Sequence, residues 1–230
     1  MDGNPPGKEP GSGAPLIGAV MTRPAFDTPP RPHSHNLRAP GLRRNNLGVD
    51  GSLTRAAGVG GMEWFEGETF RADAAVLVLL WGEPPRVLLV RKNCSVGSYW
   101  SCDAALPGGR MREGETPEEA ALREAWEEAW VHPAMVRVTG FLPVSRTRLR
   151  NITVVPVLAE PRGPLCPRPN SLEVDQVFWL PLSIVERRPE EIVHPARGIR
   201  VKGYRLVGGA VLWGVTYRIL RTLKEVLVRH

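Results

Sequence analysis

Within the segment GRMREGETPEEAALREAWEEAWV (residues 109–131), four of the glutamates and one arginine are candidates for a chemical role: Glu115, Arg123, Glu124, Glu127 and Glu128. The last three glutamates recur at i, i+3 and i+4, so a helix places their carboxylates on one face. Carboxylates gathered in this way repel one another unless a positive charge lies against them, and Mg²⁺ prefers such oxygen ligands. The segment is therefore a candidate metal site. The alternative is a solvated helix face with ordinary salt bridges.

The residues around these acids predict a helix behind a tight loop. Thr116 can cap the helix, Pro117 suits its first position, and Glu119 stands where a capping box places its acid. His132-Pro133 marks the end, because the residue before proline resists helical geometry. Ahead of the helix, Pro107-Gly108-Gly109 lets the backbone approach a ligand closely. A separate apolar stripe predicts a buried face: Leu122, Ala125 and Ala129.

The spacing of this segment resembles G-x5-E-x7-R-E-U-x-E-E-x-G-U, where U is apolar, the signature of the Nudix hydrolases. Trp130 departs from it, because the family has glycine there, which often closes the helix with a positive φ angle. We expect Trp130 either to be strained or to extend the helix slightly. The matching positions are Gly109, Glu115, Arg123, Glu124, Ala125, Glu127, Glu128 and Val131.

The resemblance implies hydrolysis of a diphosphate joined to another group. Its metal is Mg²⁺ or Mn²⁺, which activates a water molecule and neutralises phosphoryl charge. In the family, Arg123 corresponds to an orienting cation that pairs with a glutamate, and either Glu124 or Glu128 is the base that takes the proton from water. The implied metal ligands are Glu124, Glu127 and Glu128, joined by Glu115 and a backbone carbonyl near Gly109.

Three further stretches are similar to the coenzyme A diphosphatase-like group of the family: Leu88–Lys92, Trp100–Gly109 and Val211–Leu220. The group usually carries a His-x-Gly-Gln stretch where this chain has Trp100, Cys102 and Asp103. The resemblance makes coenzyme A or a related species the leading substrate. ADP-ribose or another nucleoside diphosphate derivative is the alternative, and so is a non-catalytic homologue that binds a nucleotide.

Arginines near the predicted platform are candidates for binding the substrate's phosphates, since a guanidinium offers a planar fork of donors. Arg146, Arg148 and Arg150 alternate, which favours one side of an extended segment. The net charge of +6 invites comparison with nucleic-acid-binding proteins, but the sequence has no dense basic block with interleaved aromatics, so we expect no nucleic acid partner. The predicted substrate-binding residues are Arg91, Arg110, Arg146 and Arg148.

The chain divides into two parts. Residues 1–61 are rich in glycine and proline without apolar periodicity and are predicted to be disordered, with translation from Met62 as an alternative. Residues 62–230 are predicted to form a Nudix domain, an α/β/α sandwich with a mixed β-sheet and a loop-helix-loop catalytic motif. Its expected strands are 74–81, 86–90, 135–144, 152–158 and 175–180, followed by a terminal helix with apolar positions from Val211 to Val226.

Several properties follow from composition. The longest apolar stretch, residues 206–215, is too short for a bilayer and is expected in the core, so we expect no membrane association. Three cysteines without an export signal fit a reducing cytoplasm. Cys94 and Cys102 lie eight residues apart in a predicted loop and could bridge if the source is a hyperthermophile, so the sequence leaves their pairing open. The sequence leaves the oligomeric state open, with a homodimer among the alternatives.

Overall fold

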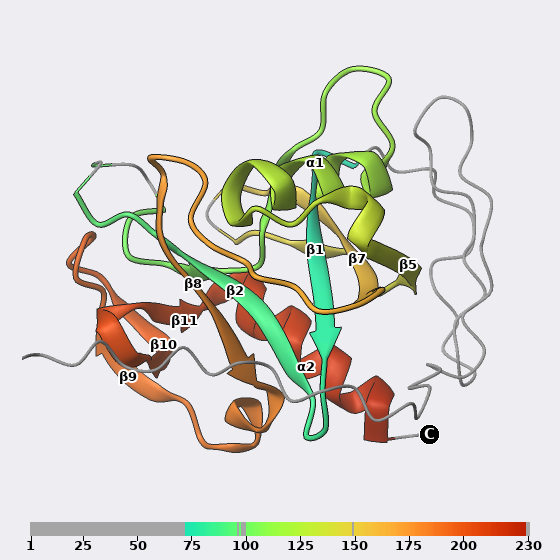
Figure 1. Ribbon diagram of the computed structural model, residues 1–230. Coiled ribbons are helices and arrows are strands. Elements are labelled where there is room, and N and C mark those ends of the chain that lie inside the picture. Colours follow the sequence, from blue (N-terminus) through green and yellow to red (C-terminus); the bar gives the residue numbers. More distant parts are fainter. Residues whose placement is uncertain (1–71, 96, 98–99, 149, 229–230) are drawn as a thin grey trace, which may run out of the picture.

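The computed structural model describes residues 72–228 except 96, 98–99 and 149 (Figure 1). The predicted extension 1–61 and the predicted domain start at Met62 lie outside the described residues.

The central sheet contains eight strands in the order β3-β2-β1-β7-β5, with β4 paired to β1, β6 to β7 and β8 to β2. β1 and β7 run parallel while the other pairs are antiparallel, so the sheet is mixed, as predicted. The strands are β1 (Ala74–Trp81), β2 (Arg86–Lys92), β3 (Ala104–Ala105), β4 (Gly108–Arg110), β5 (Val136–Phe141), β6 (Ser145–Arg146), β7 (Thr153–Pro161) and β8 (Val174–Pro181).

One helix covers each face of the sheet (Figure 1). Ala75, Leu77 and Leu79 of β1 pack with the alanines of α1 (Pro117–Ala129). The alternate residues Ala74 and Val78 pack on the opposite side with α2 (Gly214–Val228). Because neighbouring strand residues point to opposite faces, one apolar strand serves both helices. The predicted α/β/α sandwich is confirmed.

A second, three-stranded sheet lies beside the first, in the order β11-β10-β9 (Figure 1). The sequence analysis did not predict it. It comprises β9 (Glu190–Val193), β10 (Arg200–Arg205) and β11 (Val211–Trp213). The bridge between Asp103 and Val211 joins it to the segment that leads into β3. Short 3₁₀ turns complete the chain: η1 (Pro133–Met135), η2 (Leu182–Glu186) and η3 (Val207–Gly209).

Two predictions for the C-terminal region were wrong. Val211 belongs to β11 and not to the terminal helix, which begins at Gly214. The apolar run 206–215 is only partly in the core, since the Val207 side chain is 97% exposed in the η3 turn. Gly208 has φ 77° there, a left-handed value, so the apolar run turns between two strands instead of continuing as one element.

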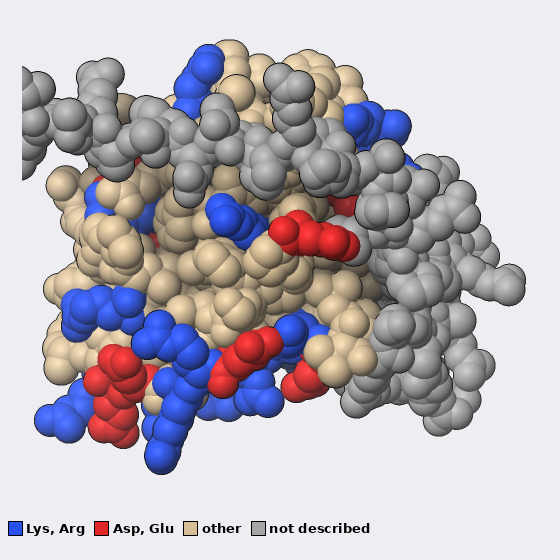
Figure 2. All heavy atoms as spheres, turned by 60° about the horizontal axis from the view of Figure 1, so that its bottom comes forward, with Lys and Arg blue, Asp and Glu red and all other residues tan. Residues whose placement is uncertain are grey.

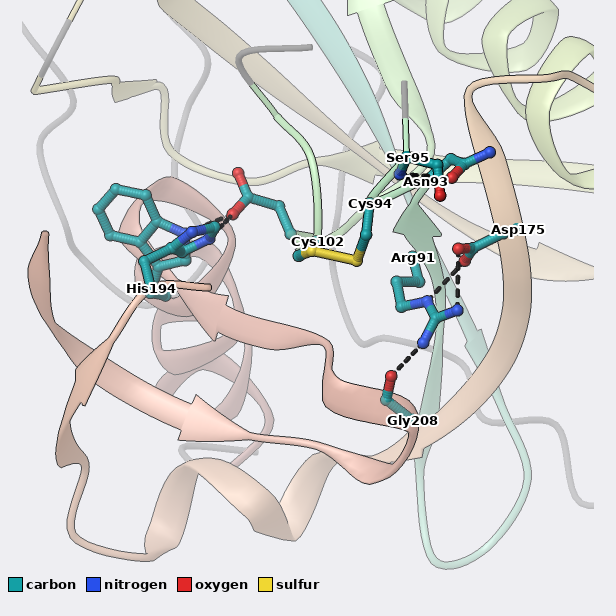
Figure 3. Close-up of a disulfide and its surroundings, with 10 residues drawn as sticks. Arg91, Asn93, Cys94, Ser95, Cys102, Asp175, His194 and Gly208 are labelled. Carbon is teal, nitrogen blue, oxygen red and sulfur yellow. Dashed lines mark hydrogen bonds and ion pairs between the residues drawn. A yellow bond between two sulfur atoms is a disulfide. The ribbon is translucent and has the colours of Figure 1, made fainter. Parts of the chain in front are cut away.

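A disulfide joins Cys94 to Cys102, with the Cα atoms 4.6 Å apart (Figure 3). The pairing of these two cysteines, which the sequence left open, is thereby decided, and Cys166 is a free, exposed thiol. The disulfide ties the residues after β2 to the residues before β3, so it closes the loop that carries Trp100.

One face of the molecule carries charges of both signs (Figure 2). Figure 2 shows, on the side that turns α2 and the second sheet forward, basic and acidic residues interspersed without a continuous basic patch. In the part of the chain that the structure describes, no helix combines the length and apolar character needed to cross a bilayer.

Candidate active site

The start of α1 has the predicted capping box. The Thr116 hydroxyl accepts a hydrogen bond from the Glu119 backbone N–H at 3.2 Å, and the Glu119 carboxylate accepts one from the Thr116 N–H at 2.9 Å. Pro117 occupies the first turn, where its missing N–H costs nothing. These contacts fix where the helix begins and hence which face its glutamates occupy.

The end of α1 shows how the chain accommodates Trp130 in place of glycine. The helix ends at Ala129, three residues before His132, and Trp130 adopts the left-handed conformation at φ 56° and ψ 35°. A residue with a Cβ is strained there by about 1–2 kcal/mol. Two contacts oppose this strain: the indole stacks on Trp126 with ring centroids 4.3 Å apart, and the Arg168 guanidinium lies 4.4 Å from the Trp130 centroid. Of the two expectations for Trp130, strain is confirmed.

Arg123 lies at the centre of the acidic face. Its guanidinium donates to Glu115 at 2.7 and 3.0 Å, to Glu124 at 2.7 Å and to Glu127 at 3.2 Å. The hydrogen bonds that Arg123 donates to Glu115 and then to Glu124 raise the pKa of Arg123 above its ordinary value. Hydrogen bonding to Arg123 lowers the pKa of Glu115. Arg123 therefore pairs with glutamates, which agrees with the orienting role implied by the resemblance.

Glu128 is the buried acid of the same face, with 5% of the residue exposed. Its carboxylate pairs with the Lys92 ammonium and accepts from the Gly108 N–H at 3.4 Å. Burial raises the pKa of Glu128 to about 6, and the attraction of Lys92 opposes that rise. Lys92 was not among the predicted site residues. Its position could have been inferred from the alternation of side chains along β2. Leu88 and Val90 face α1, so Lys92, two residues further on, faces α1 as well.

The two glycines of β4 separate the acidic face from the other side of the sheet. A Cβ at Gly109 would overlap the Glu124 carboxylate, and a Cβ at Gly108 would lie 2.5 Å from the Ala75 carbonyl oxygen. Gly108 therefore leaves no room for a side chain, whereas at Gly109 the obstacle is the flexible end of Glu124. The backbone of β4 consequently lies directly against Glu124 and Glu128, which places peptide groups among the acids.

The donor chemistry of this face fits a divalent cation, since carboxylates and a glycine carbonyl are hard oxygen ligands. Within the described residues, however, no three acidic, histidine or cysteine side chains come together as a metal-binding group. Glu115, Glu124 and Glu127 turn toward Arg123, and Glu128 turns toward Lys92. The two protein cations neutralise the acids, so a divalent cation would compete with these pairs.

A cavity of about 630 Å³ opens on the α2 side of β4. Its lining includes Gly108, Gly109 and Lys92, which adjoin the acids of α1, and the first turn of α2. Its floor is apolar, from Ala74, Val76, Ala104, Leu106 and Val154. Its basic lining residues are Lys92, Arg110, Arg148, Arg150, Arg197, Arg200, Lys202 and Arg218.

The structure separates the four arginines proposed to bind substrate. Arg110 and Arg148 line the cavity. Arg146 is exposed in β6 and does not line the cavity, because the predicted alternation stops when β6 ends at that residue. Arg91 pairs with Asp175 at 2.6 and 2.8 Å and donates to the Gly208 carbonyl (Figure 3). These contacts tie β2 to the turn before β11, which is a structural role.

Asp103, which the sequence analysis did not single out as a site residue, is held by three donors. Its carboxylate contacts His194 Nε2, Arg197 Nη2 and Trp213 Nε1, each at 2.7 Å. The donors come from the second sheet and its connecting loop, more than 90 residues away, so local sequence carried no signal of this network. It fixes the second sheet against the cavity wall.

The model of the NUDIX domain family matches residues 71–199 of this chain. The match covers β1, the glycine strand and α1, so the motif lies in the position that the family signature requires. The chain belongs to the Nudix family.

Individual relatives add detail. Over 158 residues, the chain is 37% identical to the mitochondrial coenzyme A diphosphatase NUDT8 of Homo sapiens, covering 63% of this chain and 65% of that protein. Over 160 residues, it is 34% identical to Nudix hydrolase 22, chloroplastic, of Arabidopsis thaliana, covering 64% and 52%. Over 122 residues, it is 34% identical to the peroxisomal coenzyme A diphosphatase ndx-8 of Caenorhabditis elegans, covering 48% and 49%. The chain thus spans about half to two thirds of the length of these relatives.

Proposed function

We propose that this chain is a metal-dependent diphosphatase that hydrolyses coenzyme A or a closely related coenzyme A species. The observation that carries the proposal is the position of the glycine strand β4 between the acidic face of α1 and the cation-lined cavity. In this arrangement the diphosphate end of a ligand can lie at the acidic face with a metal ion. The rest of the ligand can occupy the apolar cavity and its basic lining. Two coenzyme A diphosphatases are among the relatives.

Glu124, Glu127 and Glu128 are the proposed ligands of Mg²⁺ or Mn²⁺, with Glu115 and the Gly109 carbonyl as additional donors. When bound, such an ion neutralises phosphoryl charge and makes a coordinated water acidic enough to attack. Arg123 would keep the carboxylates from dispersing, since it already contacts three of them. Lys92 would keep Glu128 oriented toward Gly108.

Glu124 and Glu128 are the two proposed bases, and their surroundings differ. The Glu124 carboxylate lies against Gly109 of β4 and accepts a hydrogen bond from Arg123. Glu128 is buried beside Lys92. A base must reach a water molecule that also contacts phosphorus. The more accessible Glu124 suits that task better, and buried Glu128 suits a positioning or ligand role.

The cavity supports a substrate with a substantial group beyond the diphosphate. Its volume of about 630 Å³ falls in the range of small-molecule sites. The apolar floor suits a weakly polar chain, and the basic rim suits phosphate. Arg110 and Arg148 are the predicted substrate-binding residues that line it.

A substrate panel with Mg²⁺ and with Mn²⁺ tests the proposal. The panel comprises coenzyme A, ADP-ribose, dinucleoside polyphosphates and oxidised nucleotides. We expect coenzyme A to yield 4′-phosphopantetheine and 3′,5′-ADP, identified by mass spectrometry. Turnover of ADP-ribose alone would transfer the proposal to that substrate, and binding without turnover of any compound would favour a nucleotide-binding homologue.

A cytoplasmic location and a homodimer stay predictions. The names of three relatives place those proteins in the chloroplast, the mitochondrion and the peroxisome. Fractionation of cells that express the full-length protein with a C-terminal tag would test the location, and light scattering would test the dimer.

A further inference from the structure

Two arginines face the cavity on its α2 side. Arg148 follows β6, and Arg218 lies in the first turns of α2. Both line the cavity that Gly108 and Gly109 also line. The Arg218 guanidinium donates one hydrogen bond to the Arg146 carbonyl, which holds it beside the segment that carries Arg148.

These two guanidinium groups lack an acidic partner in the part of the chain that the structure describes. The single carboxylate of the cavity lining is Asp103, and its two oxygens are taken by His194, Trp213 and Arg197. Burial, and secondly the charge of Arg148, lower the pKa of Arg218. Two like charges placed side by side repel each other, and an anion bound between them would relieve that repulsion.

The sheet separates this pair from the acidic face. α1 packs on the side of Ala75 and Leu77, whereas α2 packs on the side of Ala74 and Val78. The acids of α1 and the pair Arg148 and Arg218 therefore lie on opposite sides of β4, whose Gly108 and Gly109 adjoin both. A ligand with two anionic groups, one on each side of β4, matches this arrangement.

We propose that Arg148 and Arg218 bind a phosphate monoester that the substrate carries in addition to the diphosphate being cleaved. This inference rests on the proposed function and narrows its substrate class to nucleoside diphosphate derivatives with a further phosphate on the ribose. Paired guanidinium groups suit such a group, because each provides a fork of donors for phosphate oxygens. The first turn of α2 also lines the cavity, and its dipole acts in the same direction.

The test compares substrates that differ by this phosphate alone. The selectivity of the wild-type protein is the ratio of kcat/KM for coenzyme A to kcat/KM for 3′-dephospho-coenzyme A. We expect Arg148→Gln and Arg218→Gln each to lower this ratio about 10- to 100-fold, the usual effect of removing a charge-assisted hydrogen bond. Arg221→Gln is the matched control, since Arg221 is an exposed arginine of α2 outside the cavity lining and should leave the ratio unchanged.

A binding measurement separates this inference from the proposed function. Calorimetry with 3′,5′-ADP and with 5′-AMP needs no turnover, and we expect the bisphosphate to bind more tightly in wild type but not in Arg148→Gln. That result would support the pair even if coenzyme A were not hydrolysed. Equal affinity of wild type for both nucleotides, or equal losses for both in the variants, would overturn it. Arg148→Gln keeps the test valid if Arg218→Gln unfolds, because Arg148 is exposed.

Discussion

The two sides of the glycine strand neutralise their charges in opposite ways. On the α1 side, each of the four acids lies against a protein cation, with Arg123 serving three of them and Lys92 the fourth. On the α2 side, Arg148 and Arg218 line a cavity whose one carboxylate is already engaged. The acidic face is thus internally balanced, whereas the described residues of the cavity lining offer Arg148 and Arg218 no free carboxylate.

This difference indicates how the two sides divide the work. A divalent cation must compete with Arg123 and Lys92, so the acidic face should bind it tightly only when phosphate oxygens complete the coordination shell. The cavity has no such competitor and can hold the distal part of the ligand first. We therefore expect changes on the α1 side to act on kcat and changes on the α2 side to act on substrate discrimination.

The largest effect is expected from Glu127→Gln. Removing one proposed metal ligand should lower kcat by about 10³-fold or more, since the ion supplies several kcal/mol of stabilisation to the transition state. Steady-state kinetics with coenzyme A and Mg²⁺ would measure it. Circular dichroism should show an unchanged fold, because Glu127 is exposed. Glu118→Gln, in the first turn of the same helix, is the control, and retention of activity in Glu127→Gln would show the metal assignment to be wrong.

The two glycines should respond differently to alanine. In Gly109→Ala the new Cβ meets the Glu124 side chain, which can move, so we expect about a 100-fold loss in kcat with little loss of stability. In Gly108→Ala the new Cβ meets the Ala75 backbone, which the sheet holds in place. We therefore expect a loss of about 1–3 kcal/mol in unfolding free energy. Urea unfolding and kinetics of both variants would reveal this contrast. Equal stability losses would contradict it.

The disulfide is a test of the cavity side. Replacing both Cys94 and Cys102 by serine opens a loop with a sequence separation of 8. The chain-entropy model then gives a loss of about 2–3 kcal/mol in unfolding free energy. A reductant should open the same bridge in the wild type. Chemical denaturation of the wild type with and without a reductant should therefore show the same loss of unfolding free energy. Cys166→Ser is the control, and a reductant effect that persists in the double variant would argue against the disulfide as its source.

The smallest effect concerns the end of α1. Trp130→Gly and Trp130→Ala lose the same contacts with Trp126 and Arg168, but alanine retains the strain of the left-handed conformation. We expect the alanine variant to be about 1 kcal/mol less stable than the glycine variant, measured by thermal or chemical unfolding. Equal stability of the glycine and alanine variants would show that the left-handed conformation at position 130 does not strain a residue with a Cβ.

The sequence predicted a helix or strand correctly where neighbouring residues alone determine its geometry. Thr116, Pro117 and Glu119 act within one helical turn, and β1 is an uninterrupted apolar run that one strand can satisfy. The Nudix signature likewise lies within one loop and one helix, so its residues were recognisable without a structure. The acids of α1 belong to this class.

The parts that were missed depend on contacts between distant segments. Asp103 contacts Trp213, 110 residues further along the chain, and Arg91 pairs with Asp175, 84 residues away. Val211 reads as part of a helical repeat, yet it pairs with Arg205 of β10 as a strand. Cys94 and Cys102 bridge because β2 and β3 bring them together, which spacing alone did not indicate.

The central claim is that the acidic face of α1 holds a divalent cation together with phosphate. Electron paramagnetic resonance of Mn²⁺ tests it directly, with wild type, Glu124→Gln and Glu127→Gln, each with and without 3′,5′-ADP. We predict saturable binding by wild type that tightens with the nucleotide, and at least a tenfold weakening in each variant. Equal Mn²⁺ affinity in the wild type and both variants, or no binding by the wild type, would contradict the account.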